Sequence, residues 1–288
     1  MATSSTRIPR RTSGPIQAVA DSIADLGGLV LRWMITLGDM AQFFFSMLGW
    51  ISTRLPRRDT LLPNFYQIGV LSSPVVALTG TFIGMVLAVQ SHSQFRMLNL
   101  ETRLGAVINM SLVRELGPVL AATMLAGRVG SAMAAELGTM RVTEQIDALT
   151  SMGANPIQYL VVPRFLACLI LIPTLTILAD FMGVVGGATF AIYGLGIDSN
   201  HYWENTQDFV GTFDLFSGVF KSLFFGAAIA IVSCYRGFHC DPGAEGVGRA
   251  ATSAFVISFV AILVLDFFLG IFLDNIYLMI WPEGVRLL

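Results

Sequence analysis

The first long apolar stretch of the chain, residues 16–51, has two faces. Large apolar residues recur in it at steps of three and four, and polar residues lie towards the other side, as in an amphipathic helix. Arginines flank this stretch: Arg7, Arg10 and Arg11 precede it, and Arg54, Arg57 and Arg58 follow it. Because arginine clusters favour the cytosolic side, we expect residues 16–58 to form a helix in the membrane interface, after a flexible cytosolic tail of residues 1–15. A transmembrane helix over residues 29–51 is the alternative, since that segment is long enough to span.

The rest of the chain, residues 59–288, has the apolar stretches of a transmembrane domain. Candidate crossings lie at residues 65–90, 104–126, 157–194, 216–234 and 250–273. The first contains Gly80 and Gly84, a GxxxG pair suited to close helix packing. The third stretch would be about 57 Å long as one helix, which exceeds a hydrocarbon core of about 30 Å. Pro163 and Pro173 are expected to divide it into a lead-in segment and one crossing, and a hairpin of two crossings is the alternative. The sequence thus predicts an all-α polytopic membrane protein, with an interfacial helix followed by about five transmembrane helices.

The distribution of Lys and Arg supports this topology. Twelve of the 17 fall on segments predicted to be cytosolic, and three fall on the predicted outer segments. The cytosolic segments are residues 1–58, 127–164 and 235–249, and the outer segments are residues 91–103, 195–215 and 274–288. This excess follows the positive-inside rule and places the C-terminus outside. A second crossing within residues 157–194 would instead put the acidic loop 195–215 in the cytosol.

Composition narrows the class of protein. Hydrophobic residues make up 55% of the chain and charged residues 12%, whereas a soluble domain has about a quarter charged residues. The net charge of -2 and the lack of a basic block give no sign of nucleic-acid binding. Cys168, Cys234 and Cys240 form no disulfide framework, and the spacing of the last two is poor for zinc. Neither a disulfide nor a metal site is therefore predicted.

The chain also has no phosphate-binding loop, which requires a Gly-Lys-Ser or Gly-Lys-Thr sequence. Its single lysine, Lys221, follows Phe220 and is expected to snorkel near the outer end of its helix. A transport protein with this sequence must therefore draw its energy from an ion gradient or from another chain.

Arg114 and Glu115 are unusual because they lie near the middle of the apolar stretch 104–126. An ionisable side chain at that depth costs several kcal/mol, and it normally faces a partner, a bundle interior or a wet cavity. Pro118 cannot donate to the carbonyl of Arg114, which leaves a backbone acceptor free at the same place. Together these features indicate part of a transport path. An internal charge pair that only fixes helix packing is the alternative.

Three other charged residues are expected to have structural roles. Arg128 and Glu136 stand eight positions apart, about 12 Å along a helix, so they cannot pair with each other directly. Asp266 is a second acid within a crossing, and we expect it to pair with a neighbouring helix.

Residues 127–156 are much more polar than the stretches around them and predict a cytosolic helix between two crossings. Thr143 can cap a short amphipathic helix there, with Glu144 and Asp147 in its first turn. Such a helix is suited to a groove on a partner protein, and an ordinary surface helix is the alternative.

Several motifs stand in order along residues 60–275. They are Phe82–Gln90 (FIGMVLAVQ), Arg114–Pro118 (RELGP), Ala126–Ala132 (AGRVGSA) and Ala135–Gln145 (AELGTMRVTEQ), followed by the shorter Val162–Arg164, Gly196–Asp198, Gly248–Ala250 and Leu265–Phe267. This series resembles the MlaE family of lipid ABC permeases, and its central block is highly specific.

The resemblance implies a permease that moves phospholipid and works as a homodimer in the inner membrane, with ABC ATPase subunits in the cytosol and an MCE-domain substrate-binding protein outside. The chain would bind no cofactor and have no enzymatic site of its own, because the partner ATPase uses the ATP. By residue, the family implies that Arg114, Glu115 and Leu116 border the lipid cavity. It also implies that residues 140–152 form the helix that couples the permease to the ATPase, with these candidate contacts: Arg141, Thr143, Glu144, Gln145 and Asp147.

The residues alone leave a competing class open, a proton-coupled secondary transporter with Glu115 as the proton carrier. Such a protein would need no ATPase, so copurification of an ATPase distinguishes the two classes. A membrane scaffold without transport activity would leave Arg114 and Glu115 unexplained.

Overall fold

Every regular element in residues 15–53, 58–97 and 103–280, the part of the chain that the computed structural model describes, is a helix, which confirms the all-α architecture. The α-helices are α1 (Pro15–Thr53), α2 (Arg58–Phe65), α3 (Ser73–Met97), α4 (Leu104–Ser111), α5 (Gly117–Leu125), α6 (Ser131–Val142), α7 (Gln145–Ser151), α8 (Val162–Thr189), α9 (Ser199–Phe209), α10 (Thr212–Phe238) and α11 (Ala244–Ile280). Short π-helical segments adjoin them: η1 (Tyr66–Val70), η3 (Leu112–Leu116), η4 (Ala126–Gly130), η5 (Ile157–Val161) and η6 (Phe190–Gly194).

Several of these elements join end to end into long spans. The described part of the chain contains six stretches that are long and apolar enough to cross a membrane. One is Met34–Ile51 within α1, and the others are the spans Arg58–Met97, Leu104–Val142, Ile157–Gly194, Thr212–Phe238 and Ala244–Ile280. The chain is therefore a polytopic membrane protein, and the last five stretches correspond to the five predicted crossings.

The stretch 157–194 runs as one helical span, so the alternative of a hairpin with two crossings is wrong. Pro163 stands in the first turn of α8, directly after the π-helical segment η5, and the span continues through it. Pro173 lies inside α8 and does not end it, so the expected division there is also wrong. Neighbouring groups in a helix bundle commonly satisfy the backbone acceptor that an internal proline frees.

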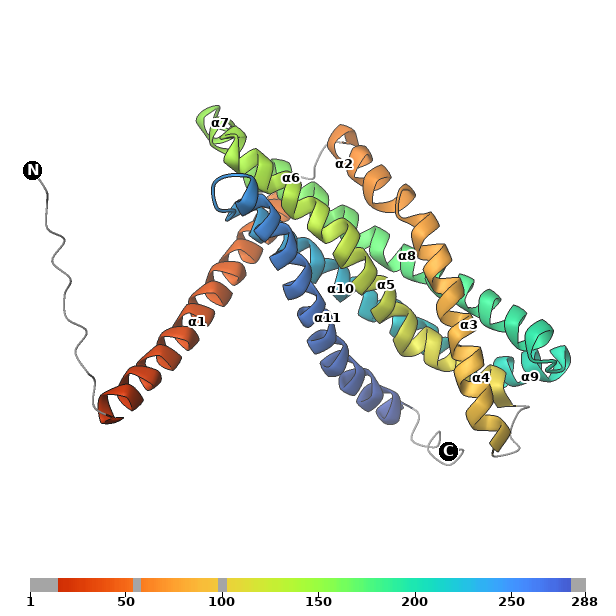
Figure 1. The fold of residues 1–288 in the computed structure, drawn as a ribbon. Helices are drawn as coiled ribbons and strands as arrows, with labels where there is room; N and C mark the ends of the chain where they lie inside the picture. Colours follow the sequence, from red (N-terminus) through yellow and green to blue (C-terminus); the bar gives the residue numbers. More distant parts are fainter. Residues whose placement is uncertain (1–14, 54–57, 98–102, 281–288) are drawn as a thin grey trace, which may run out of the picture. The chain divides into compact units, whose positions relative to one another are not determined.

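Helix α8 packs against α3 and α10, while α10 also packs against α6 and α11 (Figure 1). The predicted Gly80–Gly84 pair of α3 lies directly on the backbone of α8. A Cβ atom at Gly84 would lie 1.9 Å from the carbonyl oxygen of Gly183, and one at Gly80 would lie 2.5 Å from that of Ala179. Only glycine fits at these positions, so the close contact of the two helices depends on the pair.

The acidic segment 195–215, expected to be a loop, contains the helix α9. Asp198 caps this helix, because its side chain accepts hydrogen bonds from two backbone N–H groups of the first turn. Tyr202 of α9 is fully buried and donates a hydrogen bond to Asn109 of α4, and this burial raises the pKa of Tyr202. The acidic segment and the start of the span 104–142 therefore share one end of the bundle, as the predicted topology requires.

Two units make up the chain, residues 1–45 and residues 46–288. In the first unit the described residues belong to α1, along which large apolar side chains such as Leu31 are exposed. An exposed apolar surface of this kind fits contact with lipid, whether the helix spans the membrane or lies in its interface. The interfacial position of residues 16–58 stays a prediction, and the tail 1–15 lies outside the described residues except for its last residue.

Candidate functional site

The predicted charged pair lies in η3, a π-helical turn within the second long span. Here the N–H of Gly117 donates to the carbonyl of Leu112, five residues back instead of four. The wider turn accommodates Pro118, which has no N–H and whose ring would press on the preceding turn of a regular α-helix. The predicted backbone irregularity is therefore present, and the helix continues through it.

Lys221 of α10 is the partner of Glu115. Its Nζ atom lies 2.7 Å from Oε2 of Glu115 and 3.1 Å from Oδ1 of Asp266 on α11. The Lys221 side chain is 1% exposed, so the prediction that it snorkels to the membrane surface is wrong. Two carboxylates on neighbouring helices balance its charge inside the bundle, which removes the reason for the side chain to reach water. The expected pairing of Asp266 with a neighbouring helix is confirmed.

Arg114 has other partners. It forms an ion pair with Asp274 of α11, and its Nη1 atom lies 3.8 Å from Oδ1 of Asp214 on α10. Adjacent residues of a helix point about 100° apart, which explains why Arg114 pairs with two aspartates while Glu115 pairs with Lys221. We call these six residues the η3 charge cluster: Arg114, Glu115, Asp214, Lys221, Asp266 and Asp274. It contains four carboxylates and two cations, and it joins η3 to α10 and α11.

An apolar groove of about 520 Å³ lies farther along the same helices, with Leu120 five positions after Glu115 and Phe259 seven positions before Asp266. It is lined by residues of α3, α5 and α11: Leu78, Thr79, Phe82, Ile83, Leu120, Thr123, Met124, Phe255 and Phe259. Leu116, the third predicted cavity residue, precedes Leu120 by four positions and so lies on the same helix face. The side chains of Leu78 and Phe82 are more than half exposed, so the groove opens on the surface of the bundle. Contact of Arg114, Glu115 or Leu116 with lipid stays a prediction.

The predicted coupling segment, residues 140–152, is the end of α6, a bend and the short helix α7. Thr143 does not cap α7, as was expected, because its hydroxyl donates 2.8 Å back to the carbonyl of Thr139 and thereby closes α6. The bend falls at Glu144, whose φ of 60° is left-handed. A non-glycine residue rarely adopts this conformation, so the bend is a built feature of the segment.

The surface of this bend is polar and solvent-accessible. Arg141 and Asp147 form an ion pair across it, with 2.5 Å between Nη1 and Oδ1. The side chain of Gln145 donates to the hydroxyl of Thr143 at 3.0 Å, and Glu144 is exposed. All five predicted coupling residues therefore lie together at one tip of the bundle, where α7 projects in Figure 1.

Arg128 and Glu136 do not pair with each other, as predicted from their spacing. Arg128 donates to the hydroxyl of Ser72, and Glu136 lies 2.9 Å from Nη2 of Arg164 on α8. Both interactions join the second span to another helix, which agrees with a structural role.

Comparison with known proteins assigns the chain to a protein family. The family model described as Permease MlaE matches residues 61–272. The chain belongs to the MlaE permease family. It is 46% identical to a probable ABC transporter permease protein of Rickettsia prowazekii, over 84% of this chain and 93% of that protein. It is 34% identical to the intermembrane phospholipid transport system permease protein MlaE of Haemophilus influenzae, over 87% of this chain and 97% of that protein. It is 40% identical to TRIGALACTOSYLDIACYLGLYCEROL 1, chloroplastic, of Arabidopsis thaliana, over 75% of this chain and 61% of that protein.

The MlaE match includes η3, the apolar groove and α7, so it covers the candidate site as well as the fold. Two partners of Arg114 in this MlaE permease, Asp214 and Asp274, were missed by the sequence reasoning. They stand outside the predicted crossings, where acidic residues are ordinary, and only the extension of α10 and α11 beyond those limits brings them to η3. Asp180, buried in α8 against Gly117, was also missed, although it is an acid within a predicted crossing just as Asp266 is.

Proposed function

We propose that this chain is the membrane subunit of an ATP-driven phospholipid transporter in an inner membrane. It would act as a homodimer, with an ABC ATPase on the cytosolic side and an MCE-domain substrate-binding protein on the other. Membership of the MlaE family and the names of the relatives support this proposal. The observation that carries it is the apolar groove of α3, α5 and α11, which opens on the bundle surface and shares the second long span and α11 with the η3 charge cluster.

In this mechanism the groove holds acyl chains and the η3 charge cluster lies near the polar part of the lipid. Leu120 and Phe82 line the groove with apolar surface, and Glu115, five positions before Leu120 on the same span, has a side chain that is 44% exposed. Arg114 and Glu115 would border the water or headgroup that accompanies the chains. The six residues of the cluster join three helices, so a change in their pairing would accompany movement of α10 and α11 against η3.

The energy would enter through α7. The bend at Glu144 presents an exposed polar helix whose buried residue Ile146 anchors it to the bundle, as expected of a segment that transmits force from a partner. The partner ATPase would use the ATP, and this chain would bind no cofactor.

Reversing the exposed charges of α7 tests this coupling. In Glu144→Lys/Asp147→Lys we expect the permease to insert normally but to lose copurification of the ATPase, because two like charges at an interface oppose docking. The matched control reverses Glu204 and Asp208 on α9, which are also exposed but belong to the opposite end of the bundle. Undiminished copurification in the α7 variant would exclude residues 140–152 as the coupling segment.

Filling the groove tests the transport path. Thr123→Trp places an indole among the lining residues, and we expect ATP-dependent lipid transfer by the reconstituted complex to be lost while ATPase copurification persists. Thr174→Trp on the exposed face of α8 is the control, because Thr174 lines neither the groove nor the charge cluster. Normal transfer by folded Thr123→Trp would place the lipid path elsewhere.

A second candidate function, proton-coupled transport through Glu115, is favoured by one observation. Glu115 is a partly exposed carboxylate within a membrane-spanning stretch, as a proton carrier must be. Lipid transfer that persists without ATP and follows an imposed pH gradient would support this candidate.

A further inference from the structure

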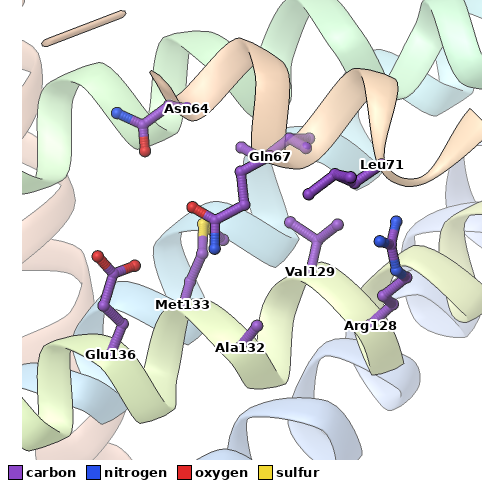
Figure 2. Close-up of a pocket in the computed structure, with 9 residues that line it drawn as sticks. Asn64, Gln67, Leu71, Arg128, Val129, Ala132, Met133 and Glu136 are labelled. Carbon is purple, nitrogen blue, oxygen red and sulfur yellow. The ribbon is translucent and has the colours of Figure 1, made fainter. Parts of the chain in front are cut away.

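A second hollow lies at the other end of the same helix as η3. This pocket of about 260 Å³ lies between α2–η1 on one side and η4–α6 on the other (Figure 2). Its lining combines polar and apolar residues: Asn64, Gln67, Ile68, Leu71, Arg128, Val129, Ala132, Met133 and Glu136. None of these residues belongs to the apolar groove or to the η3 charge cluster.

The lining of the pocket is mainly apolar, and Asn64, Gln67, Arg128 and Glu136 add polar groups to it. Ile68, Val129 and Met133 are buried, while Gln67 is exposed and extends from η1 across the pocket toward Met133 (Figure 2). Arg128 points from η4 toward the opposite helix near Leu71 (Figure 2). Such a lining suits a ligand with a polar group next to hydrocarbon.

Arg128 supplies the positive charge of this pocket. A guanidinium has five N–H donors, and the bond to the fully buried hydroxyl of Ser72 uses one of them while fixing the side chain at the wall. Glu136 at the far end is already balanced by Arg164, whose Nη2 atom is 2.9 Å away. Among the described residues no carboxylate lies within ion-pair distance of Arg128. The pocket therefore has the charge and donors that bind an anion, and a planar guanidinium suits the oxygens of a phosphate.

The pocket and the apolar groove lie along one seam between the first two long spans. On the first span, pocket residues end at Leu71 and groove residues begin at Leu78, two turns or about 10 Å farther. On the second span, Arg128 of the pocket follows Met124 of the groove by one turn. A contact of 3.2 Å between the hydroxyl of Thr79 and the sulfur of Met124 joins the two walls of this seam. The pocket, whose lining includes a guanidinium and two amides, and the apolar groove thus lie one after the other along this seam, in the order of the parts of a phospholipid.

We propose that this pocket binds the phosphodiester headgroup of a membrane phospholipid at the end of the bundle that carries α7. The guanidinium of Arg128 binds the phosphate, and the acyl chains pass Leu71 toward the groove. The inference rests on the proposed function, because the groove is taken as the path of those chains. It adds a binding site that holds the headgroup before or after the lipid passes along the groove.

Photocrosslinking in the complete complex tests the proposal. A photoreactive amino acid at Gln67, in complex reconstituted into vesicles of phosphatidylethanolamine and phosphatidylglycerol, should capture phospholipid, identified by mass spectrometry. The same group at Thr174 on the exposed face of α8 reports contact with bulk lipid and serves as the reference. We expect capture at position 67 to fall about tenfold in Arg128→Gln, the loss expected for one charge-assisted hydrogen bond, with no change at position 174.

A second variant distinguishes loss of lipid binding from loss of the fold. Ala132 is exposed in the pocket and makes no side-chain hydrogen bond, so Ala132→Phe fills the pocket without removing a partner of any residue. It too should abolish capture at position 67 while the complex keeps its size and its ATPase. Unchanged capture in Ala132→Phe, or capture of protein in place of lipid at position 67, would overturn the proposal.

Competition separates a lipid headgroup from a free anion. Added dihexanoyl-phosphatidylglycerol should reduce capture at position 67, and the same concentration of inorganic phosphate should not. Equal competition by inorganic phosphate would mean a free-anion site and would also overturn the proposal. Failure here leaves the proposed function standing if the wild-type complex still transfers lipid and Thr123→Trp does not, so the two failures are distinguishable.

Discussion

Lys221 and Arg128 are both cations within the same helix bundle, and the bundle binds them in different ways. Lys221 is 1% exposed and lies within 3.1 Å of two carboxylates, those of Glu115 and Asp266. Arg128 donates to the neutral hydroxyl of Ser72 and faces a pocket that opens beside it. A cation whose charge is balanced on both sides fixes how three helices pack. A cation that is held in place but not neutralised keeps the capacity to bind an anion.

Removal of the charge of Lys221 is expected to have the largest effect on stability. In Lys221→Met the carboxylates of Glu115 and Asp266 would face each other across the bundle without a cation. We expect a loss of about 3–5 kcal/mol in unfolding free energy, because breaking a buried ion pair leaves uncompensated charge. Chemical denaturation of the purified complex in mild detergent measures it.

Two further variants sharpen this test. Lys221→Arg keeps the charge and should keep most of the stability, and Lys221→Met combined with Asp266→Asn should recover part of the loss. If Lys221→Met alone kept full stability, the bundle would hold the two carboxylates without Lys221 at little cost in unfolding free energy. That result would weaken the contrast with Arg128.

Arg128→Gln should have a smaller effect on stability, about 1–2 kcal/mol, because it removes one hydrogen bond and leaves the buried hydroxyl of Ser72 without its partner. The same denaturation experiment checks it, and Ser72→Ala is the matched control. If Ser72→Ala lowers the unfolding free energy as much as Arg128→Gln does and leaves lipid capture at the pocket intact, then the arginine has separate structural and binding roles.

The sequence predicted the parts of this molecule that depend on local pattern. Hydropathy placed the crossings, and the Gly80–Gly84 pair predicted the close contact of α3 and α8. Local pattern was insufficient for Lys221, because snorkelling is the default for a lysine in a membrane and only tertiary packing brings Glu115 and Asp266 to it. Thr143 was misplaced for a similar reason. The residue type alone does not show whether its hydroxyl caps the next helix or bonds back to the preceding one.

The pocket at Arg128 could not be predicted from the sequence at all. Its two walls come from residues 64–71 and 128–136, which are separated by the whole of α3, α4 and α5. Each wall alone has the composition of an ordinary span end. The spacing of Arg128 and Glu136 correctly excluded a direct pair but carried no information about a cavity between helices.

Glu115→Gln should change stability least among the cluster variants, by less than about 1 kcal/mol. Glu115 is 44% exposed, and Lys221 keeps Asp266 at 3.1 Å when the other carboxylate is neutral. The double variant Arg114→Gln/Glu115→Gln should likewise stay folded and dimeric yet lose lipid transfer, if these residues border the path. Transfer assays on the reconstituted complex and size-exclusion chromatography measure the two properties. A folded double variant that moves lipid at the normal rate would remove both residues from the lipid cavity.

The smallest expected effect comes from two cysteine variants that should alter neither stability nor transport and that report on which side of the membrane α9 and the start of α11 lie. Single cysteines at Asn205 in α9 and at Glu245 in α11 are introduced into a background without Cys168, Cys234 and Cys240. An impermeant maleimide added outside should label the first, and it should label the second only after permeabilisation.

Replacement of Cys240 matters for this measurement, because it lies in the loop close to Glu245. Burial and the neighbouring Asp241 both raise the pKa of Cys240, so little of it is thiolate near neutral pH and its labelling would be slow and would rise with pH. Since α6 packs against α11, the expected pattern puts α7, and with it the end of the bundle that holds Arg128, on the cytosolic side. The reverse pattern would place α7 outside, where no ATPase could dock, and would make the headgroup pocket a station of the outer leaflet.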